Sequence, residues 1–153
     1  MNKKLTTDIY SYLNNQKNVL LIGPTDSGKT WYVKNTLIPF LQSKNLEVVY
    51  FSDPDFSLDS IPNKDSVVIV DEIEIFFDQD FLTSRSIEDK PYYSAEYLAK
   101  VKNWHKNLAK LTNPSLFVLT RNDDKEISNI VRNLKTTDWG AEVKCLVFTK
   151  KDR

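Results

Sequence analysis

The sequence predicts an α/β protein, a three-layer α/β/α sandwich built around a mainly parallel sheet of five strands. Two observations support this prediction. Short apolar runs alternate with longer segments of helical periodicity, and the runs are apolar at nearly every position. Strands that are apolar on both faces are typical of a parallel sheet that helices cover on both sides. The length of 153 residues suits one domain, so we assign residues 1–153 to a single domain.

The first half of the chain contains three of the predicted strands. Apolar side chains recur at helical spacing in residues 4–16 and again in residues 28–43. Pro39 falls inside the second of these helices and should kink or end it, because proline lacks a backbone N–H. Residues 52–65 are rich in proline and turn-forming residues, which predicts a loop. The elements predicted in this half are helix 4–16, strand 19–23, helix 28–43, strand 48–52 and strand 67–72.

The second half of the chain supplies the remaining strands. A polar and aromatic insertion, residues 73–93, separates the third predicted strand from a helix over residues 94–112. Asp123 or Asp124 is suited to cap a further helix that ends near Leu134. The strands predicted in this half are 116–120 and 145–149.

The charge balance limits the classes of function that we expect. The chain has 21 Lys and Arg residues and 21 Asp and Glu residues, so its formal net charge is zero. A strongly basic protein that binds nucleic acid without specificity is therefore not expected. The charge is uneven, because residues 1–47 carry +3, residues 48–90 carry −8 and residues 91–153 carry +5.

Cys145 is the only cysteine in the chain, and it lies in the apolar run CLVF. A disulfide within the chain is impossible, which fits a reducing compartment. We expect Cys145 to be buried as a small apolar side chain. The N-terminal residues lack the apolar stretch of a signal peptide, and no segment has the length of a membrane span. We therefore expect a cytoplasmic protein with no membrane partner.

Two of the three glycines in the chain lie in GPTDSGKT, residues 23–30. This stretch matches the phosphate-binding loop pattern G-x-x-x-x-G-K-[ST] at every fixed position, and it lies between a predicted strand and a predicted helix. Glycines allow unusual backbone conformations and let backbone amides approach a polyphosphate, and the amides at the start of the helix face the anion. The predicted nucleotide-binding residues are Gly23, Pro24, Thr25, Asp26, Ser27, Gly28, Lys29, Thr30 and Trp31.

The run VVIVDE, residues 67–72, supplies the second half of a predicted Mg²⁺–nucleotide site. Lys29 is expected to reach the β- and γ-phosphates, and Thr30 to place its hydroxyl on Mg²⁺. Asp71 ends the apolar strand and is predicted to hold Mg²⁺ directly or through water. Glu72 follows at once and is the candidate general base that orients a water toward the γ-phosphate.

With these motifs the chain resembles the P-loop NTPases of the additional-strand, catalytic-glutamate division. The resemblance covers nearly the whole chain and implies the P-loop NTPase fold, ATP as the nucleotide, and a strand inserted between the P-loop strand and the Asp71 strand. A polar sensor residue at the end of that inserted strand is also implied. Asn122 resembles the sensor asparagine of AAA+ modules, and Thr120 is the next candidate.

Two subfamilies compete for this resemblance. In AAA+ ATPases an arginine near the end of the helix before the fifth strand reaches the γ-phosphate of a neighbouring subunit, and Arg132 occupies a comparable place. That role implies a homo-oligomer or a partner protein. The second subfamily is the DNA-pumping ATPases similar to HerA, FtsK and the Zot-like phage assembly proteins. In these proteins a DE pair is followed by aromatic residues, as in DEIEIFF, residues 71–77. Their fourth strand usually ends in Thr-Gln, whereas Thr120 is followed here by Arg121.

Three further functions stay open. FTKKD, residues 148–152, resembles the guanine-specifying motif of GTPases, although no glycine follows Asp71 in the D-x-x-G pattern. A small-molecule kinase would need an arginine-rich lid, for which Arg85 is the only candidate in the insertion. A nucleotide-binding switch or scaffold with little turnover would keep the same motifs. We expect an ATPase that couples hydrolysis to the assembly or remodelling of a partner complex, with DNA as a candidate partner.

The resemblance also implies a helical lid after the fifth strand, and none follows before Arg153. Contacts to adenine are therefore expected from Tyr10 or Tyr12 in the N-terminal helix, from a partner, or hardly at all, in a site that relies mainly on the phosphates. Lys102, Lys106 and Lys110 recur every four residues and form a basic stripe on the helix over residues 94–112, which is the candidate surface for nucleic acid. The more ordinary interpretation of this stripe is a solvated helix face.

Overall fold

A computed structural model describes residues 3–24, 27–52, 56–71, 73, 95–120, 128, 132 and 143–149. The helices are α1 (Lys3–Asn14), α2 (Lys29–Tyr32), the π-helical turn η1 (Val33–Leu37), α3 (Ile38–Ser43), the 3₁₀ turn η2 (Leu58–Ser60) and α5 (Ala95–Lys110). The strands are β1 (Val19–Gly23), β2 (Val48–Phe51), β3 (Val67–Val70), β4 (Ser115–Thr120) and β5 (Lys144–Val147). The prediction of an α/β fold is confirmed.

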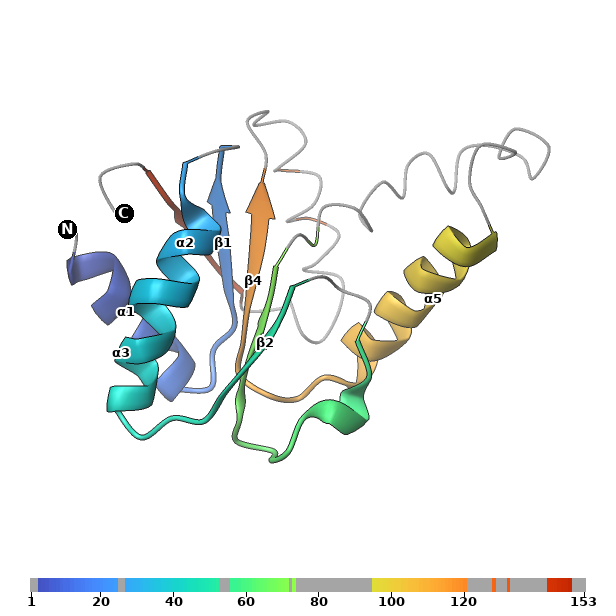
Figure 1. The fold of residues 1–153 in the computed structure, drawn as a ribbon, viewed down its shortest axis with the longest axis horizontal. Coiled ribbons are helices and arrows are strands. Elements are labelled where there is room, and N and C mark those ends of the chain that lie inside the picture. The colour runs from blue at the N-terminus through green and yellow to red at the C-terminus, as the bar shows by residue number, and fades with distance from the viewer. Residues whose placement is uncertain are drawn as a thin grey trace.

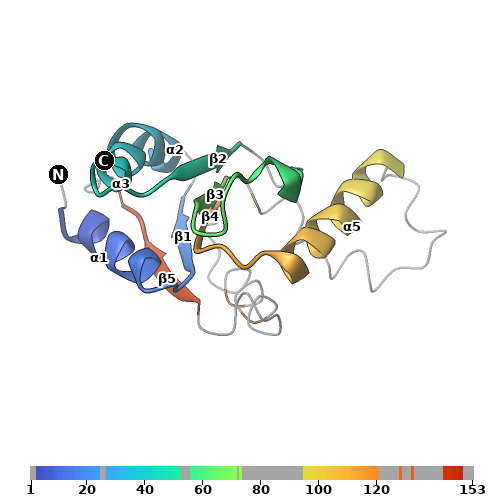
Figure 2. The same ribbon diagram turned by 90° about the horizontal axis from the view of Figure 1, so that it is seen from below.

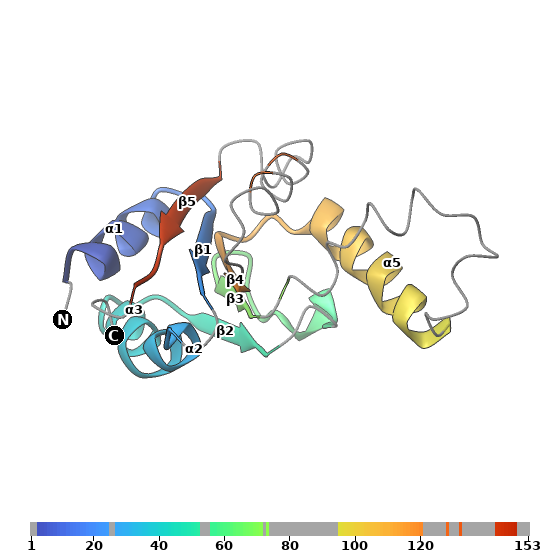
Figure 3. The same cartoon turned by 90° about the horizontal axis from the view of Figure 1, so that it is seen from above.

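The five strands form one parallel sheet with the order β2-β3-β4-β1-β5. β4 lies between β1 and β3, where the family resemblance implies an inserted strand. Because all strands run in the same direction, their carboxyl ends lie along one edge of the sheet (Figure 1). Figure 3 looks onto this edge of the sheet. In parallel sheets this edge is the usual place for a ligand site.

Helices cover both faces of the sheet, as the alternation of buried side chains requires (Figure 2). One face of the central strands packs against α1, α2, η1 and α3. The other packs against α5 and the loop that holds η2. Within β1, for example, Leu21 belongs to the first cluster and Leu20 to the second. Burial on both faces explains why these strands read as continuous apolar runs.

The segments α2, η1 and α3 follow one another without a break, so Pro39 does not end the helix. Pro39 is the second residue of α3 and follows the π-helical turn η1 closely. The turn before it widens into a π-helix, in which the Ile38 N–H donates to the carbonyl oxygen of Val33. The helix therefore absorbs the proline by a local change of hydrogen-bond pattern.

The structure corrects one sequence-based expectation at the edge of the sheet. Cys145 is exposed, because β5 is an edge strand whose residues alternate between half-buried and exposed. The predicted helix that ends near Leu134 lies mostly outside the described residues, of which Ser128 and Arg132 are helical and exposed. None of the helices in the described part of the chain has the length and apolarity that a membrane crossing needs.

Candidate nucleotide-binding site

The loop between β1 and α2 depends on both of its glycines. Gly28 has a φ of 96° and a ψ of 20°, a left-handed conformation that side chains disfavour. Gly23 is needed for a close approach instead, because a Cβ there would lie 3.0 Å from the Phe148 carbonyl oxygen and 3.0 Å from Lys29 Cδ. The left-handed conformation expected of a glycine in this loop is therefore confirmed for Gly28, whereas the close contacts of Gly23 with Phe148 and Lys29 were not predicted.

Lys29 is folded over the loop and is only 5% exposed. Its Nζ donates to the carbonyl oxygens of Gly23 at 2.8 Å and Pro24 at 2.7 Å, with a longer contact of 3.4 Å to Ser27 Oγ. Ser27 is itself fully buried. A buried ammonium group must be satisfied by such polar partners, so these contacts hold the cation at the concave side of the loop.

Asp71 joins the loop to the end of β3. Its Oδ2 accepts a hydrogen bond of 2.7 Å from Thr30 Oγ1 and another of 2.9 Å from the Tyr50 hydroxyl. The Asp71 N–H donates to the Phe51 carbonyl oxygen at 2.9 Å, which continues the β2–β3 pairing beyond the strand. Asp71 is 3% exposed, so its carboxylate is fixed from the backbone and from two hydroxyl groups.

The oxygen set at Asp71 fits Mg²⁺. Mg²⁺ prefers oxygen ligands, and proteins usually bind it through one or two carboxylates together with substrate phosphates and water. The Thr30 hydroxyl and the Asp71 carboxylate already lie within hydrogen-bonding distance of each other. The described part of the chain has no group of three or more His, Cys, Asp or Glu side chains that could hold a metal ion.

The remaining predicted site residues are distributed as follows. Trp31 is 54% exposed on α2, next to the site. Arg132 is exposed. The residues outside the described part of the chain are Thr25, Asp26, Glu72, Asn122, Arg121, Arg85 and Asp152, together with the side chain of Thr120.

The structure also corrects the expected adenine contacts. The ring of Tyr10 packs edge-on against Phe40 with centroids 5.9 Å apart, and Phe40 lies about 15 Å along the helix from Thr30. The N-terminal half of α1 is the part that lies near the loop, because the Thr6 hydroxyl there forms a buried hydrogen bond of 2.6 Å with the Tyr32 hydroxyl of α2. Tyr12 lies further from that half than Tyr10, so neither tyrosine is suited to contact a base.

Tyr50 is the site residue that the sequence analysis missed. It sits in VVYFS, where it reads as an ordinary strand aromatic, and Lys34 Nζ lies 5.1 Å from the centre of its ring. A usable signal was present, because Tyr50 stands near the end of the strand beside the Asp71 strand. A hydroxyl at that position can reach a carboxylate at the end of the neighbouring strand.

No protein-family model and no curated protein sequence matches this chain. Among solved structures, Saccharomyces cerevisiae RIF2 aligns with a TM-score of 0.50 and 12% identity, over 94% of this chain and 53% of that chain. Rif2 in complex with the C-terminal domain of Rap1 aligns with a TM-score of 0.46 and 15% identity, over 94% of this chain and 51% of that chain. This chain therefore spans about half the length of the structures that it matches, and the similarity describes the fold alone.

Proposed function

We propose that this protein binds ATP with Mg²⁺ in the loop of residues 23–30 and hydrolyses it. The observation that carries the proposal is the 2.7 Å hydrogen bond from Thr30 to Asp71, which joins the start of the helix after the loop to the end of β3. The insertion of β4 between β1 and β3 further supports an ATPase of the additional-strand, catalytic-glutamate division.

Each residue then has a defined role. Lys29, which is held at the concave side of the loop, exchanges its carbonyl partners for the β- and γ-phosphate oxygens. The backbone amides at the start of α2 face the phosphates. Thr30 and Asp71 hold Mg²⁺, which when bound neutralises charge on the phosphates. In this proposal Glu72 orients the attacking water and Asn122 acts as the sensor residue.

The proposal extends to oligomers through Arg132, which would act as an arginine finger on the nucleotide of a neighbouring copy. Its exposure is compatible with such a role. ATP is favoured over GTP because Asp71 is followed by Glu72 and not by the D-x-x-G pattern. The work that hydrolysis drives is proposed to be the assembly or remodelling of a partner complex.

Binding is tested first, by titrating a fluorescent ATP analogue with the purified chain in Mg²⁺ and again in EDTA. We expect saturable binding that weakens in EDTA and is lost in Lys29→Ala. Lys44→Ala is the matched control, because Lys44 is an exposed lysine near the far end of the same helical segment. Equal binding by Lys29→Ala and the control would overturn the proposed site.

Hydrolysis is tested separately, by measuring phosphate release from ATP for wild type and Glu72→Gln. We expect the variant to bind ATP normally and to lose turnover by about 100-fold or more, since a general base contributes about that much. Binding without measurable turnover in the wild type would identify a nucleotide switch instead. Competition by GTP as effective as that by ATP would contradict the assignment of ATP.

A further inference from the structure

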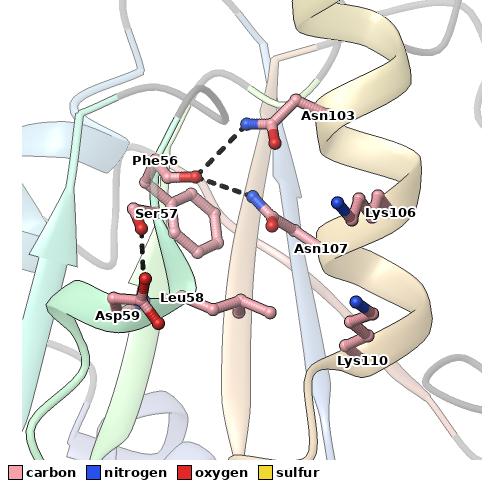
Figure 4. Close-up of a pocket in the computed structure, with 8 residues that line it drawn as sticks. All are labelled: Phe56, Ser57, Leu58, Asp59, Asn103, Lys106, Asn107 and Lys110. Atoms are coloured by element: carbon pink, nitrogen blue, oxygen red, sulfur yellow. Dashed lines mark hydrogen bonds between the residues drawn. The ribbon is translucent and has the colours of Figure 1, made fainter.

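A groove runs between the loop after β2 and the C-terminal half of α5, on the opposite face of the sheet from α2 (Figure 4). Its main hollow has a volume of about 470 Å³. A smaller hollow of about 220 Å³ continues it, since Leu58 and Lys110 line both. We call this continuous depression the α5 groove. The described residues that line it include none of those that form the candidate nucleotide site.

Asparagine side chains fix the two walls of the α5 groove relative to each other. Asn107 Nδ2 donates to the Phe56 carbonyl oxygen at 2.7 Å, and Asn103 Nδ2 donates to the same oxygen at 3.3 Å. Asn113 Nδ2 donates to the carbonyl oxygens of Asn63 and Ser66, both at 2.9 Å. Asn107 and Asn113 are only 5% and 8% exposed. A groove held by buried hydrogen bonds is formed before a ligand arrives, which lowers the entropic cost of binding.

The rim of the α5 groove is basic. Lys106 and Lys110 line the main hollow from α5, and Lys64 lines its continuation. All three lysines are exposed, and Figure 4 shows those from α5 turned toward the loop wall. Among the described residues, Asp59 is the only acidic one that lines either hollow. The groove therefore has the charge to attract an anionic ligand.

The aromatic residues at this groove argue against nucleic acid. Proteins that bind single strands stack the bases on accessible aromatic rings. Phe56 is 7% exposed and its ring is stacked on Phe51 with centroids 4.3 Å apart, and Trp104 beneath it is fully buried. The accessible apolar side chains among the described lining residues are the exposed Pro62 and the half-buried Leu58 and Ile61. Aliphatic surface beside ammonium groups suits a peptide with aliphatic and acidic side chains.

We propose that the α5 groove binds an extended acidic segment of a partner protein. Lys106 and Lys110 are one helical turn apart, about 6 Å along the axis. Alternate residues of an extended peptide are separated by about 6.6 Å and point to the same side. Carboxylates at alternate positions can therefore pair with these lysines, while the intervening aliphatic side chains face Leu58 and Ile61. This inference does not depend on nucleotide binding.

The test is fluorescence anisotropy of a labelled peptide that alternates Glu and Leu. We expect wild type to bind it, and the double variant Lys106→Glu/Lys110→Glu to bind about tenfold more weakly or worse. Lys106→Gln/Lys110→Gln is the second variant, because it removes both charges but keeps polar side chains and so tests the charge even where charge reversal perturbs the fold. Lys4→Glu/Lys44→Glu, in exposed residues on the other face of the sheet, is the matched control and should bind as wild type does.

Three results would overturn the proposal. The first is that wild type does not bind the Glu/Leu peptide, and the second is that the lysine variants bind it as tightly as wild type does. The third is that wild type binds a labelled oligodeoxythymidylate more tightly than the peptide and that the lysine variants abolish this binding. The last result would assign the groove to nucleic acid. Lys29→Ala serves as a further control, because it should bind the peptide as wild type does even where nucleotide binding is lost.

Discussion

Tyr50 and Phe51, the last two residues of β2, point to opposite faces of the sheet and serve different regions of the molecule. The Tyr50 hydroxyl donates to the Asp71 carboxylate in the candidate nucleotide site. The Phe51 ring stacks on Phe56 at the base of the α5 groove. One short strand thus supports two binding regions, because successive strand residues alternate between faces.

The two regions are assembled differently along the chain. The nucleotide site is mainly a contiguous stretch, residues 23–30, completed by Tyr50 and Asp71. The α5 groove has no contiguous core, since Phe56 is bonded to asparagines that lie 47 and 51 residues further along the chain. The comparison leads us to expect that substitutions in the first region change ligand affinity most. Substitutions of Asn103 and Asn107, which hold the walls of the α5 groove together, should mainly change stability.

Asp71→Asn should have the largest effect on ligand binding. Removal of the carboxylate charge should weaken binding of the ATP analogue in Mg²⁺ by about 100-fold, or about 2.8 kcal/mol, because a neutral amide is a poor Mg²⁺ ligand. The side chain keeps its shape, and its amide oxygen can still accept from Thr30 and Tyr50. Asp65→Asn, at an exposed acidic residue, is the control for the same titration. Unchanged affinity in Asp71→Asn would remove Asp71 from the site.

Asn107→Ala should have the next largest effect, and it should act on stability. Loss of a buried 2.7 Å hydrogen bond should lower the free energy of unfolding by about 1–3 kcal/mol. Asn103→Ala is the matched comparison, because its bond to the same oxygen is 3.3 Å long and only partly buried, and it should cost less than about 1 kcal/mol. Urea unfolding of both variants measures the difference. Equal decreases in the free energy of unfolding would mean that the Asn107 hydrogen bond does not contribute more to stability than the Asn103 hydrogen bond.

Tyr50→Phe should have the smallest effect of the three. It removes one hydrogen bond to Asp71 Oδ2 and keeps the ring that lies beside Lys34. We expect the Mg²⁺ concentration needed for half-maximal ATP binding to rise by about tenfold, as for other residues that orient a metal ligand. Tyr10→Phe, on a ring that packs against Phe40, should leave this value unchanged. An unchanged Mg²⁺ requirement in Tyr50→Phe would show that Thr30 and the backbone hold Asp71 without it.

Contiguous patterns are what the sequence allowed us to predict. All five strands were located to within a few residues. For β1, β3 and β4 the reason is that burial on both faces leaves an uninterrupted apolar run. The unusual backbone conformation of Gly28 followed from the eight-residue motif. The family resemblance implied the position of β4 between β1 and β3, which the strand order confirms.

Features that depend on distant parts of the chain were not predicted. The asparagines of α5 read as ordinary polar residues of a helix, because their partner carbonyls belong to a loop about 50 residues away. Cys145 reads as a core residue, and only the position of β5 at the edge of the sheet shows it to be exposed. Pro39 reads as a helix breaker, whereas a π-helical turn accommodates it.

A crystal structure of the chain with a non-hydrolysable ATP analogue and Mg²⁺ tests the central claim most directly. We predict that the triphosphate lies within residues 23–30, with Lys29 Nζ on the β- and γ-phosphates. We also predict that Mg²⁺ takes the place of the direct hydrogen bond between Thr30 and Asp71, with the metal held by both residues directly or through water. A nucleotide bound elsewhere, with Thr30 still bonded to Asp71 and Lys29 still bonded to the Gly23 and Pro24 carbonyls, would contradict the account.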